Sequence, residues 1–383
     1  MKNTPLNLSV VRLRSWPPTI KIATLERTAG MKCRICDGNK LEPLNVEGFL
    51  FPVTSYAPEF HQYENFVCPD CGVISIQPEP TDAALADYYN AAYRTSSNAL
   101  CVGSKKIDTP VDLNVGGRSM ARVKNFHKLL TRNSNPESNL IPQTEDRVID
   151  FGAYQGLFLC GVSQLWSCHC TAYDYSDSGI AFARDYLGFS DSQVAKDIYT
   201  DLFDGGKARF ATMLHSLEHL REPIRFLEHL RHDILAANGL LYIEVPNLRG
   251  TALCDPTHFF TYTKQSLSYL LDRGGYDVID IDHSGFPTGP DFAAFNDEQN
   301  LICLARPRQE NTSTCGPPGV KLSALRHDIR ASYAQHSRGA VRRQAVIAVR
   351  ETARAIYYFL FISVLERLSP RLALRIARLL KRR

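Results

Sequence analysis

The sequence predicts an α/β protein whose core is a Rossmann-like, doubly wound and mostly parallel sheet. From Arg147 onward, short apolar runs alternate with helical segments. Two paired-cysteine motifs precede this region, and a basic segment with helical periodicity follows it. Strands that alternate with helices are typical of a sheet covered on both faces. We therefore expect three parts: a small cysteine-bearing module, the α/β core and a helical C-terminal tail.

The core is expected to begin with a strand over residues 148–151 and to continue as strand and helix pairs. The later predicted strands cover residues 171–173, 210–214, 240–245, 278–281 and 301–304. Helices are predicted over residues 161–166 and 180–187. A further helix begins at Pro223, carries Leu227, Leu230 and Ile234 on one face, and is expected to end at Gly239.

Composition indicates a globular protein in a reducing compartment. The 383 residues are 44% hydrophobic and 22% charged, and none of the apolar runs is long enough to span a membrane. Eleven cysteines, an odd number, are spread over a long chain without a secretory signal, which argues against a disulfide framework. We predict a cytoplasmic protein.

Composition and pattern also divide the chain. Residues 1–30 lack periodicity and are expected to be a disordered extension before Met31. The segments that follow are the cysteine-bearing module (31–80), a helical lid or linker (81–140), the core (141–306), a polar linker (307–325) and a basic tail (326–383). Tyr93 and Arg94 lie in the lid segment, where they either reach over a substrate or pack as part of an ordinary helix.

Four cysteines have the spacing of a structural zinc site. Cys33 and Cys36 form one CxxC pair, and Cys68 and Cys71 form a second pair, with 31 residues between the two pairs. Two such turns supply four thiolates in a closed tetrahedral shell, which lets a small module fold around a small core. A redox pair is the alternative, and a nucleic-acid-binding zinc ribbon is disfavoured because few Lys and Arg surround the motif.

A glycine-containing turn after the first core strand predicts a nucleoside cofactor. The segment Asp150-Phe-Gly-Ala-Tyr-Gln-Gly156 has Gly152 where the backbone must turn sharply, and Gly156 at the start of the following helix. Asp174 ends the next strand, where a carboxylate accepts hydrogen bonds from ribose hydroxyls. Tyr154 occupies the position at which a dinucleotide requires glycine, so S-adenosylmethionine fits better. An ordinary strand–turn–helix corner is the alternative.

Residues 147–305 resemble class I S-adenosylmethionine-dependent methyltransferases, in the branch of sugar methyltransferases with an N-terminal zinc-binding module. The shared motifs are DFGAYQG at 150–156, TAYDYS at 171–176, HSLEHLREP at 215–223, GLLYIEVPN at 239–247 and HFFTYTKQSL at 258–267. The chain departs from the family at Tyr154 and Ala211. It also has Asp255 and Thr257 where the sugar C-methyltransferases have Tyr and Glu, which disfavours C-methylation.

The resemblance implies a methyltransferase that acts on a sugar, glycan-type or other small-molecule hydroxyl. It assigns cofactor binding to Asp150, Gly152, Gly156 and Asp174. Two alternatives stay open: a zinc-ribbon nucleic-acid-binding protein with an inert α/β core, and a nicotinamide-dependent oxidoreductase. Nucleic acid is an unlikely partner for the main body, because residues 1–320 carry a net charge of −8.

His219 and His258 are the candidate catalytic residues. Both are expected at the carboxyl edge of the sheet, where open α/β folds bind ligands. Imidazole has a pKa suited to accepting a proton from a hydroxyl nucleophile. The alternative for each histidine is a structural hydrogen bond to backbone.

The C-terminal tail has the pattern of an interfacial amphipathic helix. Residues 321–383 contain 15 Lys and Arg against 3 Asp and Glu. After Pro370, leucines and an isoleucine share one helical face and arginines share another. Peripheral contact with an anionic membrane surface is one prediction, and docking on the acidic body or on a second subunit is the other.

Overall fold

The structure is a computed structural model. It describes residues 31–44, 64–83, 85, 117–135, 137–248, 257–285, 287–288, 294–295, 299–309 and 315–329. The predicted extension 1–30, the lid residues Tyr93 and Arg94, Asp255 and most of the basic tail lie outside these residues. Within the described part of the chain, no helix is long and apolar enough to cross a membrane.

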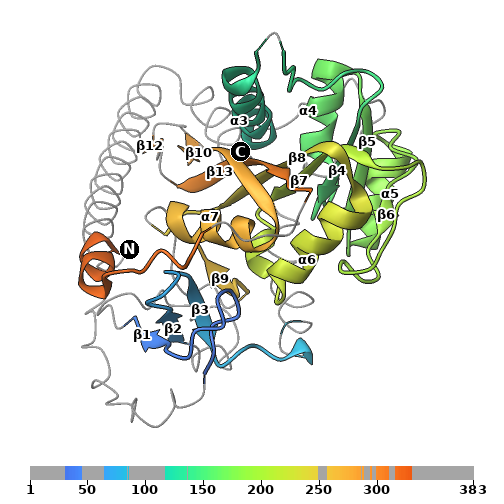
Figure 1. The fold of residues 1–383 in the computed structure, drawn as a ribbon. Helices are drawn as coiled ribbons and strands as arrows, with labels where there is room; N and C mark the ends of the chain where they lie inside the picture. The colour runs from blue at the N-terminus through green and yellow to red at the C-terminus, as the bar shows by residue number, and fades with distance from the viewer. Residues whose placement is uncertain are drawn as a thin grey trace, which may run out of the picture.

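A seven-stranded sheet forms the core, as the sequence predicts (Figure 1). Its strands, in spatial order, are β10 (Tyr276–Ser284), β13 (Asn300–Pro307), β8 (Leu235–Pro246), β7 (Ala208–Leu214), β4 (Arg147–Phe151), β5 (His169–Asp174) and β6 (Gln193–Val194). The pairs among β8, β7, β4, β5 and β6 are parallel, and β13 pairs antiparallel with both β8 and β10. The chain order reverses between β4 and β7, which is where ligands bind in open α/β sheets.

Helices cover both faces of the sheet. Three of them, α3 (Gly117–Asn133), α4 (Leu157–Trp166) and α5 (Asp177–Asp185), share one hydrophobic cluster with Val148, Phe210 and Tyr242 of the strands. The other face packs against α6 (Pro223–His229) and α7 (Lys264–Arg273). Successive strand residues point to opposite faces, so these buried strands are apolar on both sides.

The helix that begins at Pro223 does not extend to Gly239, and this prediction was wrong. It ends in a π-helical turn over Leu230–Ile234, and β8 begins at Leu235. Gly239 lies within β8, where the pairing with β7 is irregular. Ala208 pairs with Leu235 and Phe210 pairs with Leu240, so β8 has three extra residues in this interval. A Cβ at Gly239 would lie 2.7 Å from the Ala236 carbonyl oxygen, so this glycine permits a tight bend in a strand.

The cysteine-bearing module forms a separate four-stranded sheet that includes a strand from the core sequence. The order is β1 (Glu42–Pro43), β2 (Glu64–Val67), β3 (Ile74–Gln77) and β9 (Phe260–Thr261). In Figure 1, orange β9 lies beside blue β3, and the two strands pair antiparallel. The module is therefore joined through backbone hydrogen bonds to the segment that carries His258.

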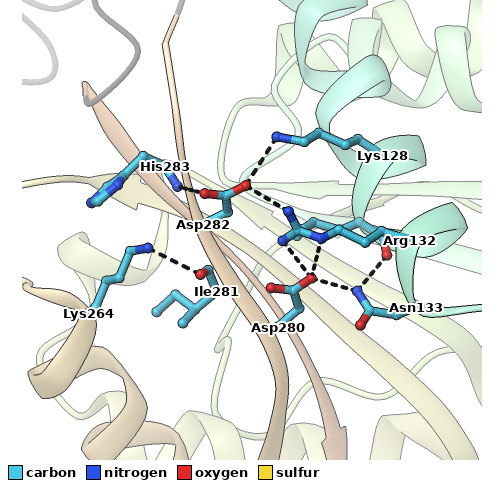
Figure 2. A network of polar contacts seen from close by, with 9 residues as sticks. Lys128, Arg132, Asn133, Lys264, Asp280, Ile281, Asp282 and His283 are labelled. Atoms are coloured by element: carbon cyan, nitrogen blue, oxygen red, sulfur yellow. Dashed lines mark hydrogen bonds and ion pairs between the residues drawn. The ribbon is translucent and has the colours of Figure 1, made fainter.

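Charged residues fasten α3 to the outermost strand of the core sheet (Figure 2). Arg132 pairs with Asp280 at 2.6 Å and with Asp282 at 3.0 Å, Lys128 lies 3.1 Å from Asp282, and Asn133 donates to Asp280 at 2.6 Å. Within the predicted lid or linker segment 81–140, the polar residues from Thr131 onward are expected to form the linker, but α3 continues to Asn133. These contacts explain that difference, because they are made in the last turn of the helix.

A helix that begins within the predicted linker 307–325, and so earlier than expected, packs on the cysteine-bearing module. Residues 322–329 are helical, and Leu325 and Ile329 are buried in a cluster with Leu44, Val67 and Ile74. The basic amphipathic helix predicted after Pro370 lies outside the described residues. Its membrane contact stays a prediction.

Candidate active site

The carboxyl ends of four neighbouring parallel strands bring the predicted site residues to one edge of the sheet. Asp150 lies in β4 and Asp174 ends β5. The segment that carries His219 follows β7, and β8 ends beside it. Tertiary contact then joins the two halves of this edge, since the turn after β4 meets Ser216 in the segment after β7.

The turn after β4 needs glycine at two positions for different reasons. Gly152 has φ +80°, and a Cβ there would overlap the Ser216 hydroxyl, with the Ser216 Cβ at 3.0 Å. Gly156 has φ +72°, and its nearest neighbours would lie at an ordinary 3.5 Å from a Cβ. A Cβ at Gly156 would therefore fit without overlap. Its positive φ is what favours glycine there.

Asp174 holds the turn in place through its own carboxylate. The backbone N–H of Tyr154, a residue with φ +48°, donates to Asp174 Oδ2 at 2.8 Å. The N–H of Ser176 donates to Oδ1 at 2.8 Å. Burial raises the pKa of Asp174, and these two N–H donors partly offset the increase. Tyr175, the next residue, is 62% exposed.

Asp150 is buried below the turn and is 2% exposed. Among the described residues, Thr212 is its hydrogen-bond partner, and the Thr212 hydroxyl donates to Asp150 Oδ1 at 2.7 Å across the β4–β7 pair. Burial raises the pKa of Asp150 to about 7, against the opposing effect of that hydrogen bond. The group is thus poised to change charge when a cation approaches.

Three histidines surround one buried carboxylate at the end of β7. Glu218 Oε1 lies 3.5 Å from Nδ1 of His215, and 4.0 Å from Nε2 of both His219 and His258. The rings of His219 and His258 are edge to face, with centroids 4.7 Å apart. His219 Nδ1 lies 2.8 Å from the Thr257 carbonyl oxygen. The structure therefore brings the two predicted catalytic histidines together, although they are distant in sequence.

Local structure explains this convergence. Leu217–His219 form a single 3₁₀ turn, which aims Glu218 into the core and leaves His219 half-buried. His258 arrives from the other direction, two residues before β9, because β9 is paired with β3 of the cysteine-bearing module. The position of His258 beside Glu218 therefore depends on the cysteine-bearing module, in addition to the core and the motif around His219.

Two residues that influence the charges of the site, His215 and Glu244, were not predicted from the sequence. His215 Nε2 lies 3.3 Å from Glu244 Oε1, and Arg122 Nε donates to the same oxygen at 2.8 Å. Burial opposes ionisation of Glu218, but the three histidines lower its pKa to about 2. The pKa of His215 is raised, because the two carboxylates outweigh its burial. The signal available in sequence was the H-x-x-E-H spacing of residues 215–219.

The four predicted zinc ligands also converge. Cys33 Sγ lies 3.6 Å from Cys71 Sγ, Cys36 Sγ lies 3.4 Å from Cys68 Sγ, and all four sulfurs lie within 4.8 Å of one another. Tetrahedral zinc with Zn–S bonds of about 2.3 Å sets its sulfurs roughly 3.8 Å apart. The donor set and its spacing thus fit a structural zinc ion.

Residues 119–281 match the family model of a methyltransferase domain. The chain is an S-adenosylmethionine-dependent methyltransferase. The match begins within α3 of the methyltransferase and ends within β10, so it includes the turn at Gly152 and the cluster at Glu218.

Solved structures with a similar fold were also found for the methyltransferase. The 1,6-didemethyltoxoflavin-N1-methyltransferase of Burkholderia thailandensis is 15% identical, with 65% of this chain and 96% of that chain covered and a TM-score of 0.42. A methyltransferase of Aquifex aeolicus is 16% identical, with coverages of 48% and 96% and a TM-score of 0.36. A search of curated proteins found no match.

Proposed function

We propose that this methyltransferase transfers a methyl group to a hydroxyl of a sugar, a glycan-type precursor or another small molecule. The observation that carries the proposal is the cluster of Glu218, His219 and His258 next to the cofactor turn. Ser216 belongs to the same segment and contacts Gly152 of that turn. The polar cluster and the cofactor turn are thus two halves of one site.

The cofactor end of the site has matching chemistry for each part of S-adenosylmethionine. The Asp174 carboxylate is placed to accept hydrogen bonds from the ribose hydroxyls. The exposed ring of Tyr175 offers a stacking surface for the adenine. Asp150 has a raised pKa and would ionise when a cation approaches. Its carboxylate is therefore suited to the positively charged ammonium and sulfonium groups of S-adenosylmethionine. When bound, this cofactor supplies the electrophilic methyl group.

The acceptor end supplies positioning and proton removal. In the reaction, the acceptor O–H bond breaks, an O–CH₃ bond forms, and the S–CH₃ bond of the cofactor breaks. The product is a methyl ether together with S-adenosylhomocysteine and one proton. A hydroxyl nucleophile gains from a group that removes its proton, and Glu218, His219 and His258 form the polar group nearest the turn that has this capacity.

The four-cysteine site is proposed to hold structural zinc that orients the acceptor end. The zinc would fix the turn before β1 and the turn between β2 and β3, and β3 pairs with β9 beside His258. Zinc here does no chemistry on the substrate, since four cysteine ligands leave no open position.

Calorimetry with S-adenosylhomocysteine, with NAD as the comparison ligand, tests the cofactor assignment. We expect binding of the first and not of the second, and at least about tenfold weaker binding in Asp174→Ala, because charge-assisted hydrogen bonds contribute about 1.5–3 kcal/mol. Asp177→Ala, an exposed carboxylate on α5, is the matched control. Absence of binding by the wild-type protein would refute the function. A transfer assay from labelled cofactor into hydroxyl-bearing precursors then tests the acceptor class.

A further inference from the structure

We infer that Glu218, His219 and His258 bind a divalent transition-metal cation, in a second metal site separate from the four cysteines. One ring nitrogen of each histidine and a carboxylate oxygen of Glu218 lie within 4.8 Å of one another. Both imidazole nitrogens are 4.0 Å from Glu218 Oε1. A point equidistant from three atoms with this spacing is about 2.5 Å from each. Metal bonds to His and carboxylate are about 2.0–2.2 Å long, so a contraction of a few tenths of an ångström closes the site.

The surroundings of His219 match those of a metal ligand. Its Nδ1 lies 2.8 Å from the Thr257 carbonyl oxygen, which requires the proton to be on Nδ1. In the neutral ring, Nε2 then carries the lone pair, and this nitrogen lies 4.0 Å from Glu218 Oε1. Metal-bound histidines nearly always donate their second N–H to a carbonyl or carboxylate in this way.

Glu218 provides an independent indication of a cation. It is 0% exposed, and among the described residues neither of its oxygens makes a hydrogen bond. A buried carboxylate without hydrogen bonds is strongly unfavourable unless a cation is close.

Two buried carboxylates, Glu218 and Glu244, and two basic side chains, Arg122 and His215, carry the charge around this cluster. Arg122 pairs with Glu244 at 2.8 Å, and His215 lies between Glu244 and Glu218, at 3.3 Å and 3.5 Å. Arg122 balances one of the two buried carboxylates, and His215 is the basic neighbour that both share. Nε2 of His219 and Nε2 of His258 each lie 4.0 Å from Glu218 Oε1 and complete the basic groups around this carboxylate.

Two imidazoles and one carboxylate select the class of metal. This donor set suits Zn²⁺, Fe²⁺, Co²⁺ or Mn²⁺ rather than Ca²⁺. Three protein ligands leave positions open for an outside oxygen, unlike the closed four-cysteine site.

The role of this metal rests on the proposed function, whereas its binding does not. The acceptor hydroxyl takes an open position, and the cation lowers its pKa as it does for bound water. The hydroxyl proton leaves to solvent, the oxygen forms its bond to the methyl carbon, and the carbon–sulfur bond breaks. The metal keeps its oxidation state throughout.

Cobalt titration of the full chain tests the site directly. The reduced protein is stripped with a chelator and titrated with Co²⁺, which gives thiolate charge-transfer absorption only when cysteine binds it. We expect two equivalents, of which one produces that absorption and one does not. Glu218→Gln and His258→Ala are expected to weaken the second equivalent at least about tenfold and to retain the first. Retention of the thiolate absorption shows that each variant still folds around its cysteines.

Two matched controls complete the design. His283→Ala removes a half-buried histidine of β10, outside the cluster, and both equivalents should remain. Cys36→Ser should lose the thiolate absorption and also weaken the second equivalent, because β3 of the same module pairs with β9 beside His258.

Binding of a single equivalent by the wild-type protein, with full thiolate absorption, would overturn the metal inference. Unchanged binding of the second equivalent in both Glu218→Gln and His258→Ala would overturn it as well. Loss of S-adenosylhomocysteine binding with two cobalt equivalents intact would instead refute the proposed function alone.

Discussion

Replacing Gly152 by alanine separates two costs that the structure assigns to this turn. Gly152 has φ +80°, and a Cβ there would overlap the Ser216 hydroxyl. Gly188 has nearly the same φ, +75°, but nothing lies within 4 Å of the position of its Cβ. Both alanine variants therefore strain the backbone at a positive φ, but only Gly152→Ala also creates an atomic overlap.

The magnitudes follow from these two geometries. A non-glycine residue in the left-handed region costs about 1–2 kcal/mol, which applies to both variants. Forcing atoms into an occupied space costs a further ~1–3 kcal/mol, which applies to Gly152→Ala alone. We expect Gly152→Ala to lower the free energy of unfolding by about 2–5 kcal/mol and Gly188→Ala by about 1–2 kcal/mol.

Urea unfolding of the two variants measures this difference, and calorimetry with S-adenosylhomocysteine measures the effect on the site. Gly152→Ala should weaken binding by about tenfold or more, since a shift of the turn by 1 Å is enough to misplace its backbone donors. Gly188→Ala should bind normally. Adding Ser216→Ala to Gly152→Ala should restore roughly 1 kcal/mol, because it removes the overlapping hydroxyl but leaves the Ser216 Cβ.

Equal destabilisation by Gly152→Ala and Gly188→Ala would refute the packing argument. The same conclusion would follow if Ser216→Ala restored no stability to Gly152→Ala.

Three further predictions concern charge and metal. Burial opposes ionisation of Asp282, but the His283 N–H, Lys128 and Arg132 lower its pKa to about 2. Its stabilisation of roughly 1–2 kcal/mol is thus present above pH ~4 and lost as the pH falls to about 2, and acid unfolding of Asp282→Asn followed by circular dichroism should lack that loss. Burial raises the pKa of Asp150 to about 7, so stability should fall as the pH rises from ~4 to about 7. Ligand cations near it should release a proton at pH 7, seen as buffer-dependent calorimetric enthalpy that disappears in Asp150→Asn. Cys36→Ser should lower kcat at least about tenfold while S-adenosylhomocysteine binding stays within about twofold, because the zinc module orients His258 and not the cofactor turn; a loss confined to binding would contradict this.

The helices, strands and turns that depend on short-range sequence patterns could be predicted from the amino-acid sequence. Strands such as β4 and β7 appear as apolar runs, and α3 as helical periodicity that includes the buried Phe126. The CxxC spacing predicts the four-cysteine cluster, because each pair is formed within a single turn. The turn at Gly152 and the acid at Asp174 follow from adjacent strand and helix signals.

Contacts between residues that are distant in sequence could be identified from the tertiary structure alone. The pairing of β9 with β3 places His258 against Glu218, and no local pattern encodes a pairing between segments nearly two hundred residues apart in sequence. The buried His215 and Glu244 pair depends on the β7–β8 register, and the end of α6 depends on where β8 must start to keep that register. Periodicity reports which face of an element is apolar, whereas contacts between elements are set by packing of the whole core.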